Sequence, residues 1–357
     1  MDSVLARLIA FYLPQFHPIP ENDEWWETGF TEWTNTAKAK PLFRGHYQPH
    51  VPADLGFYDL RVPETRAAQA ELARAYGVEA FCYYHYWFAG KRLLQRPFTE
   101  VLATGEPDFP FCLCWANQTW TGVWHGAPDR ILIEQTYPGE TDHREHFETL
   151  LPAFRDPRYV RVDDKPLFVI YRPSDFPDPV KTMQLWRTMA TEAGLPGLHL
   201  VGSNIGVERK PSEFGLDAAT RARLPERRPW VPKRTPLKWL ARQYQEWSGK
   251  PTIYRYADVV PELLAPAMEI GADYPCLIPN WDNTPRSGKD GLVLHDSTPE
   301  LFEQHARLAL ERVKSYPAGH NLVFVKSWNE WAEGNYLEPD LKFGHRYLET
   351  LRDVFVR

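Results

Sequence analysis

The chain has 357 residues, a length that a barrel of eight alternating strands and helices often reaches as one domain. Its net charge of −6 argues against a general nucleic-acid binder, which usually carries a basic excess. No apolar stretch approaches the length of a membrane span, and Met1–Gln15 has no signal-peptide core. We therefore expect a cytoplasmic protein with no nucleic-acid partner and no integral membrane segment.

The composition is unusual in its aromatic residues, with 14 Trp and 17 Tyr. Such rings fill large cores, but they also stack well on the C–H faces of sugars. The four cysteines, at positions 82, 112, 114 and 276, lie in apolar runs without zinc-type spacing, so we expect buried reduced thiols.

Short apolar runs alternate with helical patterns, which indicates parallel strands joined by crossover helices. The expected strands are Leu8–Leu13, Ala80–Tyr86, Phe111–Trp115, Leu167–Tyr171, Leu198–Ser203, Gly215–Ala219, Pro275–Pro279 and Leu322–Ser327.

Helix ends support this alternation. The pattern over Pro63–Tyr76 stops at Gly77, and Asp178–Ala193 stops at Gly194, as helices often do before a left-handed glycine. Thr298–Tyr316 begins with an N-cap followed by proline, and a last helix is expected over His345–Phe355. Because no Gly-x-Gly phosphate loop is present, the pattern favours a closed α/β barrel, a (β/α)8 TIM barrel, over 1–357 as a single domain.

Two connections are long, and long barrel loops usually shape the rim of the active site. The first covers Pro14–Leu60. The second, a predicted insertion over 205–253, contains nine Lys or Arg between 221 and 250 against two Glu. This stretch is either a solvated surface or a contact for an anionic or lipid-linked glycan.

Chemistry in such barrels belongs at the carboxyl ends of the strands. Aromatic and amide residues cluster at four of these ends: Tyr83–Trp87, Trp115–Trp120, Asn280–Asn283 and Trp328–Trp331. Neutral hydrogen-bonding groups between aromatic rings suit a polyhydroxylated ligand.

Glu330 and Glu333 are the expected catalytic pair, because they follow the eighth strand three residues apart and are flanked by Trp328 and Trp331. Cleavage of a glycoside needs one group that donates a proton and another that assists from the opposite side. Burial and a neighbouring carboxylate would raise the pKa of one of the two. We expect no metal, because Pro49 between His46 and His50 makes a helical metal pair unfavourable and no third ligand is evident. We also expect no cofactor.

Several motifs resemble the glycoside hydrolase family 99-like proteins of WbsX type, which occur in bacterial polysaccharide gene clusters. The resemblance covers nearly the whole chain and rests on the segments 10–17, 29–35, 45–50, 81–87 and 327–331. It implies a retaining glycosidase in which Glu330 removes the proton of the sugar 2-hydroxyl and Glu333 is the acid/base. The intermediate would be a 1,2-anhydro sugar, which requires an α-manno configuration such as that of mannose or rhamnose.

With this resemblance we expect a free or lipid-linked oligo- or polysaccharide as substrate. The family often has a Glu where this chain has Gln118, so a substrate contact inferred for that position is in doubt. The expected substrate contacts are Tyr12, Glu32, Trp33, His46, His50, Tyr84, His85, Trp87, Asn117, Trp120, Trp281, Asp282, Arg286, Trp328, Asn329 and Trp331.

Two other functions stay open. A glycosyltransferase of polysaccharide synthesis is disfavoured by the absence of Asp-x-Asp, although metal-independent transferases lack it as well. A non-catalytic carbohydrate-binding protein would have little use for the paired Glu residues.

Overall fold

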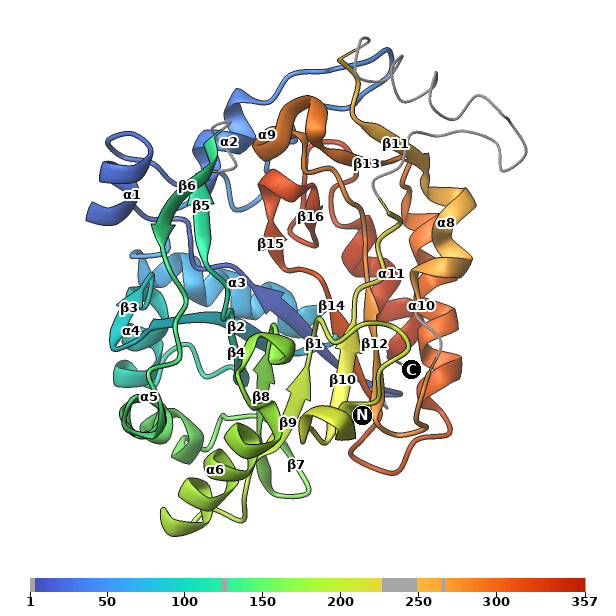
Figure 1. Ribbon diagram of the computed structural model, residues 1–357. Coiled ribbons are helices and arrows are strands. Elements are labelled where there is room, and N and C mark those ends of the chain that lie inside the picture. Colours follow the sequence, from blue (N-terminus) through green and yellow to red (C-terminus); the bar gives the residue numbers. More distant parts are fainter. Residues whose placement is uncertain (1–3, 123–126, 227–248, 265–266, 357) are drawn as a thin grey trace, which may run out of the picture.

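The computed structural model describes residues 4–122, 127–226, 249–264 and 267–356. Eight parallel strands pair in the order β1–β2–β4–β8–β9–β10–β12–β14, and β14 pairs with β1 to close the barrel (Figure 1). The strands are β1 (Arg7–Tyr12), β2 (Val78–Phe88), β4 (Phe111–Trp115), β8 (Lys165–Ile170), β9 (His199–Gly202), β10 (Ala218–Arg221), β12 (Asp273–Leu277) and β14 (Leu322–Val325).

The barrel strands are buried on both faces, which is why their sequences read as nearly continuous apolar runs. Every residue of β4, β9, β10, β12 and β14 is buried. Each of the eight strands overlaps the range expected from the sequence, so the prediction of a closed (β/α)8 barrel is confirmed. The four cysteines are buried free thiols within or beside this core, as expected.

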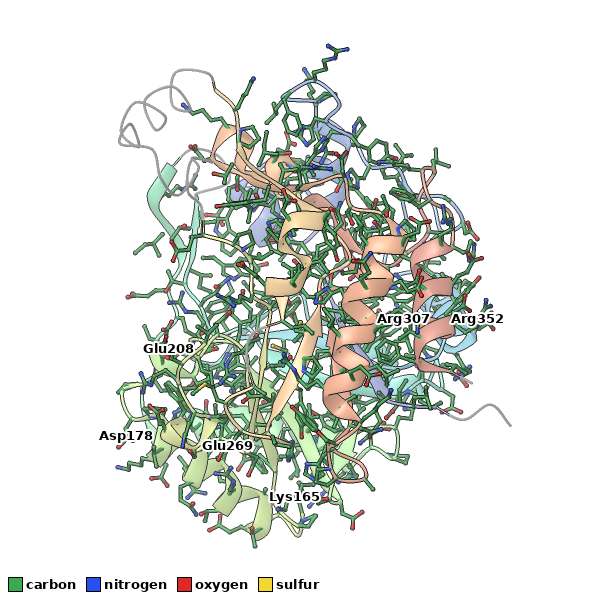
Figure 2. The ribbon with its side chains drawn as sticks, turned by 90° about the vertical axis from the view of Figure 1, so that its right-hand side faces the viewer. Lys165, Asp178, Glu208, Glu269, Arg307 and Arg352 are labelled. Carbon is green, nitrogen blue, oxygen red and sulfur yellow. The ribbon has the colours of Figure 1, made fainter. Side chains whose placement is uncertain are left out.

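Helices cover the outside of the barrel (Figure 1). They are α3 (Pro63–Ala75), α4 (Arg96–Thr104), α5 (Glu140–Arg155), α6 (Pro179–Glu192), α8 (Tyr256–Leu263), α10 (Pro299–Val313) and α11 (Arg346–Phe355). The predicted helix ends agree within a few residues: Gly77 and Gly194 have positive φ, and the Thr298 side chain accepts from Leu301 N at the start of α10. Arg307 and Arg352 mark the outer faces of α10 and α11 (Figure 2).

One crossover departs from strict alternation. The connection from β9 to β10, all of which is described, contains only the 3-10 helix η3 (Pro211–Phe214). The range 205–253, expected as an insertion, contains the barrel strand β10. Most of the basic stretch in that range, residues 227–248, lies outside the described residues.

Short elements follow the carboxyl ends of the strands and form the rim above the barrel (Figure 1). They are α1 (Pro20–Trp25), α2 (Glu32–Lys38), β3 (Lys91–Leu93), β5 (Trp120–Gly122), β6 (Ala127–Ile133), η2 (Pro173–Asp175), β11 (Thr252–Arg255), α9 (Thr284–Ser287), η4 (Gly288–Asp290), β13 (Leu292–His295), β15 (Asn329–Glu330), η5 (Trp331–Glu333) and β16 (Asn335–Tyr336); β7 (Arg161–Val162) precedes β8. Within the described ranges, no helix is long and apolar enough to cross a bilayer.

Candidate active site

The segment after β14 folds back on itself as a small hairpin above the barrel. Asn329 pairs with Tyr336 and Glu330 with Asn335, so that η5 and Gly334 form the turn. Ser327 Oγ fixes the base of the hairpin, because it donates to Asn335 O at 2.7 Å and accepts from Glu330 N at 2.9 Å. This hairpin places Glu330 and Glu333 over the carboxyl end of the barrel.

Gly334 allows the tight turn that follows Glu333. Its φ is +59°, a left-handed conformation that residues with a side chain rarely adopt. A Cβ at this position would lie only 2.9 Å from Asp282 Cβ, and Asp282 N donates to Glu333 O at 2.7 Å. The loops after β12 and β14 are therefore joined directly behind Glu333.

Arg286 on α9 links three carboxyl groups from two loops, those that follow β1 and β14. Its Nη1 lies 2.6 Å from Glu333 Oε1 and 4.0 Å from Glu330 Oε2. Its Nε lies 2.8 Å from Oε1 of Glu32, a fully buried residue on α2. A bidentate guanidinium of this kind holds carboxyl groups in fixed orientations.

A second cation, Lys326, lies on the other side of Glu330. Its Nζ is 3.5 Å from Glu330 Oε1 and 3.3 Å from the hydroxyl of Tyr84. The rings of Tyr84, Tyr171 and Trp281 surround the ammonium with centroids 5.6–6.0 Å away. Glu330 is thus placed between an ammonium and a guanidinium, both mostly screened from water.

These surroundings move the two pKa values in opposite directions. Burial alone would raise the pKa of Glu330, but the Lys326 charge, a hydrogen bond from Glu333 and the Arg286 charge together lower it well below its ordinary value. Burial and the charge on Glu330 raise the pKa of Glu333, and the Arg286 charge only partly opposes them. Near neutral pH, the pair therefore holds one carboxylate and one carboxylic acid, as an acid–base catalyst requires.

Four of the expected contact residues lie around this pair, and five others belong to the scaffold that supports it. Glu32, Tyr84, Trp281 and Arg286 lie at the pair. The supporting residues form buried hydrogen bonds or ring contacts with the scaffold: Tyr12 with Gln69, Trp33 with Tyr58, Trp328 with Phe81, Asn329 with Leu13, and Trp331 with Glu338. For these five residues, direct contact with a substrate stays a prediction.

Another four expected residues lie at the third strand or between the barrel wall and α5. His85 Nε2 is 2.7 Å from His146 Nε2, and Trp87 Nε1 donates to Asp142 at 3.0 Å. Asn117 is fully buried and bonds to both backbone groups of Arg172. Trp120 is half-buried on β5 beside Trp25. The structure does not bring these four residues to the carboxyl pair.

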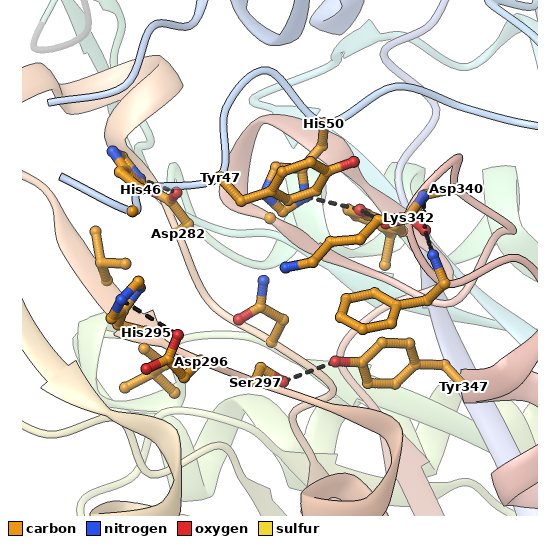
Figure 3. Close-up of a pocket in the computed structure, with 17 residues that line it drawn as sticks. His46, Tyr47, His50, Asp282, His295, Asp296, Ser297, Asp340, Lys342 and Tyr347 are labelled. Carbon is orange, nitrogen blue, oxygen red and sulfur yellow. Dashed lines mark hydrogen bonds and ion pairs between the residues drawn. The ribbon is translucent and has the colours of Figure 1, made fainter. Parts of the chain in front are cut away.

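The last three expected residues meet on the far side of the hairpin. Leu42 N donates a hydrogen bond to Nδ1 of His46. The proton of the His46 ring is therefore on Nε2, which donates to Asp282 Oδ2 at 2.6 Å. His50 Nδ1 lies 2.7 Å from the hydroxyl of Tyr336. These residues line a separate cavity, drawn in Figure 3.

Sequence reasoning missed two charged residues of this region. Lys326 is the only charged residue in the expected strand Leu322–Ser327, which is otherwise mostly apolar. A lone cation in such a strand was the sequence feature that could have identified it. Glu338 accepts from Gln69, Tyr58 and Trp331 at 2.6–2.9 Å, and no local pattern marks it.

A family model described as "Glycosyltransferase WbsX" matches residues 8–351. A relative from Xanthomonas campestris pv. campestris (strain B100), named "Uncharacterized protein WxcX", is 41% identical over 358 residues. The match covers 100% of this chain and 50% of that protein, so the chain spans about half the length of the curated relatives it matches.

Solved structures share the fold at low sequence identity. A "Glycoside hydrolase-like protein" superposes with a TM-score of 0.58 at 14% identity, covering 98% of this chain and 94% of the other. The GH99 endo-alpha-mannosidase from Bacteroides thetaiotaomicron superposes with a TM-score of 0.57 at 15% identity, covering 97% and 96%. At 14% and 15% identity, these comparisons show a shared fold and nothing further.

Proposed function

Because the chain belongs to the WbsX family, whose fold is shared by glycan-processing enzymes, we propose that it is a retaining glycoside hydrolase. Its substrate would be an α-linked manno-configured glycan, built on mannose or rhamnose, of a bacterial polysaccharide. The observation that carries this proposal is the pair of buried Glu330 and mostly buried Glu333, whose pKa values are shifted in opposite directions.

In the first step, the Glu330 carboxylate takes the proton of the sugar 2-hydroxyl while O2 attacks the anomeric carbon. The bond from that carbon to the leaving oxygen breaks, and Glu333 gives its proton to the departing oxygen. The products are a 1,2-anhydro sugar and the free leaving group. Lys326 and Arg286 favour the ionised form of Glu330 before this step.

In the second step, Glu333 is a carboxylate and takes a proton from water, whose oxygen attacks the anomeric carbon. The bond between that carbon and O2 breaks, and Glu330 returns its proton to O2. Two inversions at one carbon leave the configuration unchanged. An α-manno configuration is required, because O2 must lie on the side opposite the leaving group.

The proposal is tested by turnover of α-mannan and α-rhamnan oligosaccharides. Glu330→Gln and Glu333→Gln should each lower kcat by at least about 100-fold, the usual contribution of an acid or base. An aryl glycoside, whose leaving group needs little protonation, should restore the first step, and with it kcat/KM, in the Glu333→Gln variant but not in the Glu330→Gln variant. The kcat of Glu333→Gln should stay low even with this substrate, because the variant lacks the base of the second step. Glu148→Gln, at an exposed position on α5, is the matched control. Undiminished turnover by either site variant would refute these roles.

The family description favours a second candidate, a glycosyltransferase that builds rather than cleaves the glycan. A transferase must bind an activated sugar donor, whereas the proposed hydrolase has no use for one. Calorimetric titration with UDP- and GDP-sugars distinguishes the two functions. Saturable binding of a nucleotide sugar would favour the glycosyltransferase over the hydrolase. The proposed hydrolase predicts no heat of binding.

A further inference from the structure

The cavity in Figure 3 lies beside the carboxyl pair but does not contain it. Its space, including the part open to solvent, is about 550 Å3. The lining comes from the loops that follow β1, β12 and β14, from β13 with the residues after it, and from Tyr347 on α11. Neither Glu330, Glu333, Arg286 nor Lys326 lines it. Asp282 and Gly334 line the cavity, and the hydrogen bond from Asp282 N to Glu333 O joins this wall to the segment that carries the carboxyl pair.

Hydrogen-bond acceptors predominate in this cavity. Ser297 Oγ donates to Pro279 O at 2.7 Å, so the bond between Ser297 and Tyr347 at 2.8 Å uses the proton of the tyrosine. The Tyr347 oxygen therefore keeps lone pairs for a ligand. Asn280 Oδ1 is a buried acceptor with no hydrogen-bond partner among the described residues. The exposed carboxylate of Asp296 adds two more oxygens, one of them 3.2 Å from His295 Nε2.

Aromatic rings and one cation complete the lining. The Lys342 ammonium lies 4.4 Å from the centroid of the Tyr47 ring and 4.7 Å from that of Phe343. In Figure 3, Lys342 extends across the cavity below Tyr47, with His295 and Asp296 on the opposite side. Rings beside polar groups are a common feature of sites that bind a sugar.

The charges argue against an anionic ligand, although phosphate often binds at the loops after strands seven and eight of such barrels. Three carboxylates, those of Asp282, Asp296 and Asp340, line the cavity against the single ammonium of Lys342. Burial lowers the pKa of His50, so this residue adds no positive charge near neutral pH. Phosphate oxygens accept hydrogen bonds, as do most groups that line the cavity, whereas sugar hydroxyls donate them.

We propose that this cavity is a second carbohydrate site, which binds one neutral hexopyranose residue of the glycan. The inference rests on the proposed function for the class of ligand. The sugar hydroxyls donate to Asp296, Asn280 and Tyr347, and Lys342 donates to a ring or hydroxyl oxygen. Because Glu330 and Glu333 do not line the cavity, this residue of the glycan is held without contact with the reacting bond.

The test follows the His295 ring signals by NMR, assigned by comparison with His295→Gln, while methyl α-D-mannopyranoside or methyl α-L-rhamnopyranoside is added. At least one of the two sugars should shift these signals saturably in the full chain. Asp296→Ala should weaken that binding at least about tenfold, because a charged acceptor is lost. Glu330→Gln should leave the binding unchanged, and inorganic pyrophosphate should not compete.

The proposal is overturned if neither sugar shifts the His295 signals, or if Asp296→Ala binds as tightly as the parent. Competition by pyrophosphate that is lost in Lys342→Ala would show an anion site instead. Thermal unfolding of Asp296→Ala checks that this exposed position has not altered the fold. If the sugar shifts His295 but no oligosaccharide is cleaved, the proposed function fails while this site stands.

Discussion

Arg286 donates from Nη1 to Oε1 of Glu333 at 2.6 Å, and this contact decides which oxygen of the carboxyl group carries the proton. A guanidinium has no lone pair to accept a proton, so Oε1 is held as an acceptor. Oε2 is buried and receives no hydrogen bond from a donor group of the described residues. The acidic proton of Glu333 therefore belongs on Oε2.

The pH profile should show a broad acidic plateau and an alkaline decline. The active form has Glu330 ionised and Glu333 protonated. Because burial and the Glu330 charge raise the pKa of Glu333 to about 8, the active form is lost as the pH rises through that value. The pKa of Glu330 is lowered, so protonation of the base reduces activity only under strongly acidic conditions.

Lys326→Met should move the acidic decline to higher pH. The methionine keeps most of the side-chain volume but removes the charge that lowers the pKa of Glu330. Between pH 4 and 9, kcat/KM of the variant should decrease as the pH is lowered from neutral, whereas kcat/KM of the parent should stay constant over the same acidic range. Lys181→Met, at an exposed position on α6, is the control. An unchanged acidic limb would show that Lys326 does not set the ionisation of the base.

Removal of the Arg286 charge should move the alkaline decline upward, because the guanidinium lowers the pKa of Glu333. Arg286→Met alone would leave Glu32 buried without its countercharge, so the test uses the double variant Glu32→Gln/Arg286→Met. We expect kcat to fall about tenfold or more, because Glu333 is no longer oriented, with the alkaline limb at higher pH. A profile that moves to lower pH would contradict this role.

Gly334→Ala should destabilise the hairpin beyond the cost of its backbone conformation. Gly344 has a similar φ, +57°, with no atom within 4 Å of an added Cβ, so Gly344→Ala measures the conformational cost alone, about 1–2 kcal/mol. At Gly334 the contact with Asp282 adds a further cost of about 1–3 kcal/mol. Urea unfolding of the two variants gives the difference, and equal losses would contradict the close contact.

Glu338→Ala should cost at least about 3 kcal/mol of unfolding free energy. The substitution leaves the donors of Tyr58, Gln69 and Trp331 buried without an acceptor, at about 1–3 kcal/mol each. Glu148→Ala, on an exposed helix face, provides the comparison and should change stability by less than about 0.5 kcal/mol. If Glu338→Ala and Glu148→Ala lowered the unfolding free energy by similar amounts, the hydrogen bonds of Glu338 would not stabilise the hairpin.

The sequence was sufficient for the barrel but not for which side of a strand each residue faces. On β2, the Tyr84 side chain reaches Lys326 inside the barrel, whereas the neighbouring His85 contacts His146 on α5 outside it. Alternate residues of a strand point to opposite faces, yet both faces of this strand are buried, so no change of polarity distinguishes them.

Contacts between distant loops were equally hidden. Arg286 and Glu32 are separated by 254 residues, and Asp282 and His46 by 236. Each residue was expected to contact substrate because it follows a strand end or belongs to a motif. Their pairing depends on how the loops cross above the barrel, which local patterns do not encode.

The most direct test of the proposed mechanism is the configuration of the product when it first forms. An α-linked mannose or rhamnose oligosaccharide that the enzyme cleaves is followed by ¹H NMR from the first minutes, before the free sugar equilibrates between its anomers. Attack by O2 followed by attack by water predicts that the α anomer appears first and the β anomer only later. Initial release of the β anomer would contradict the roles proposed for Glu330 and Glu333.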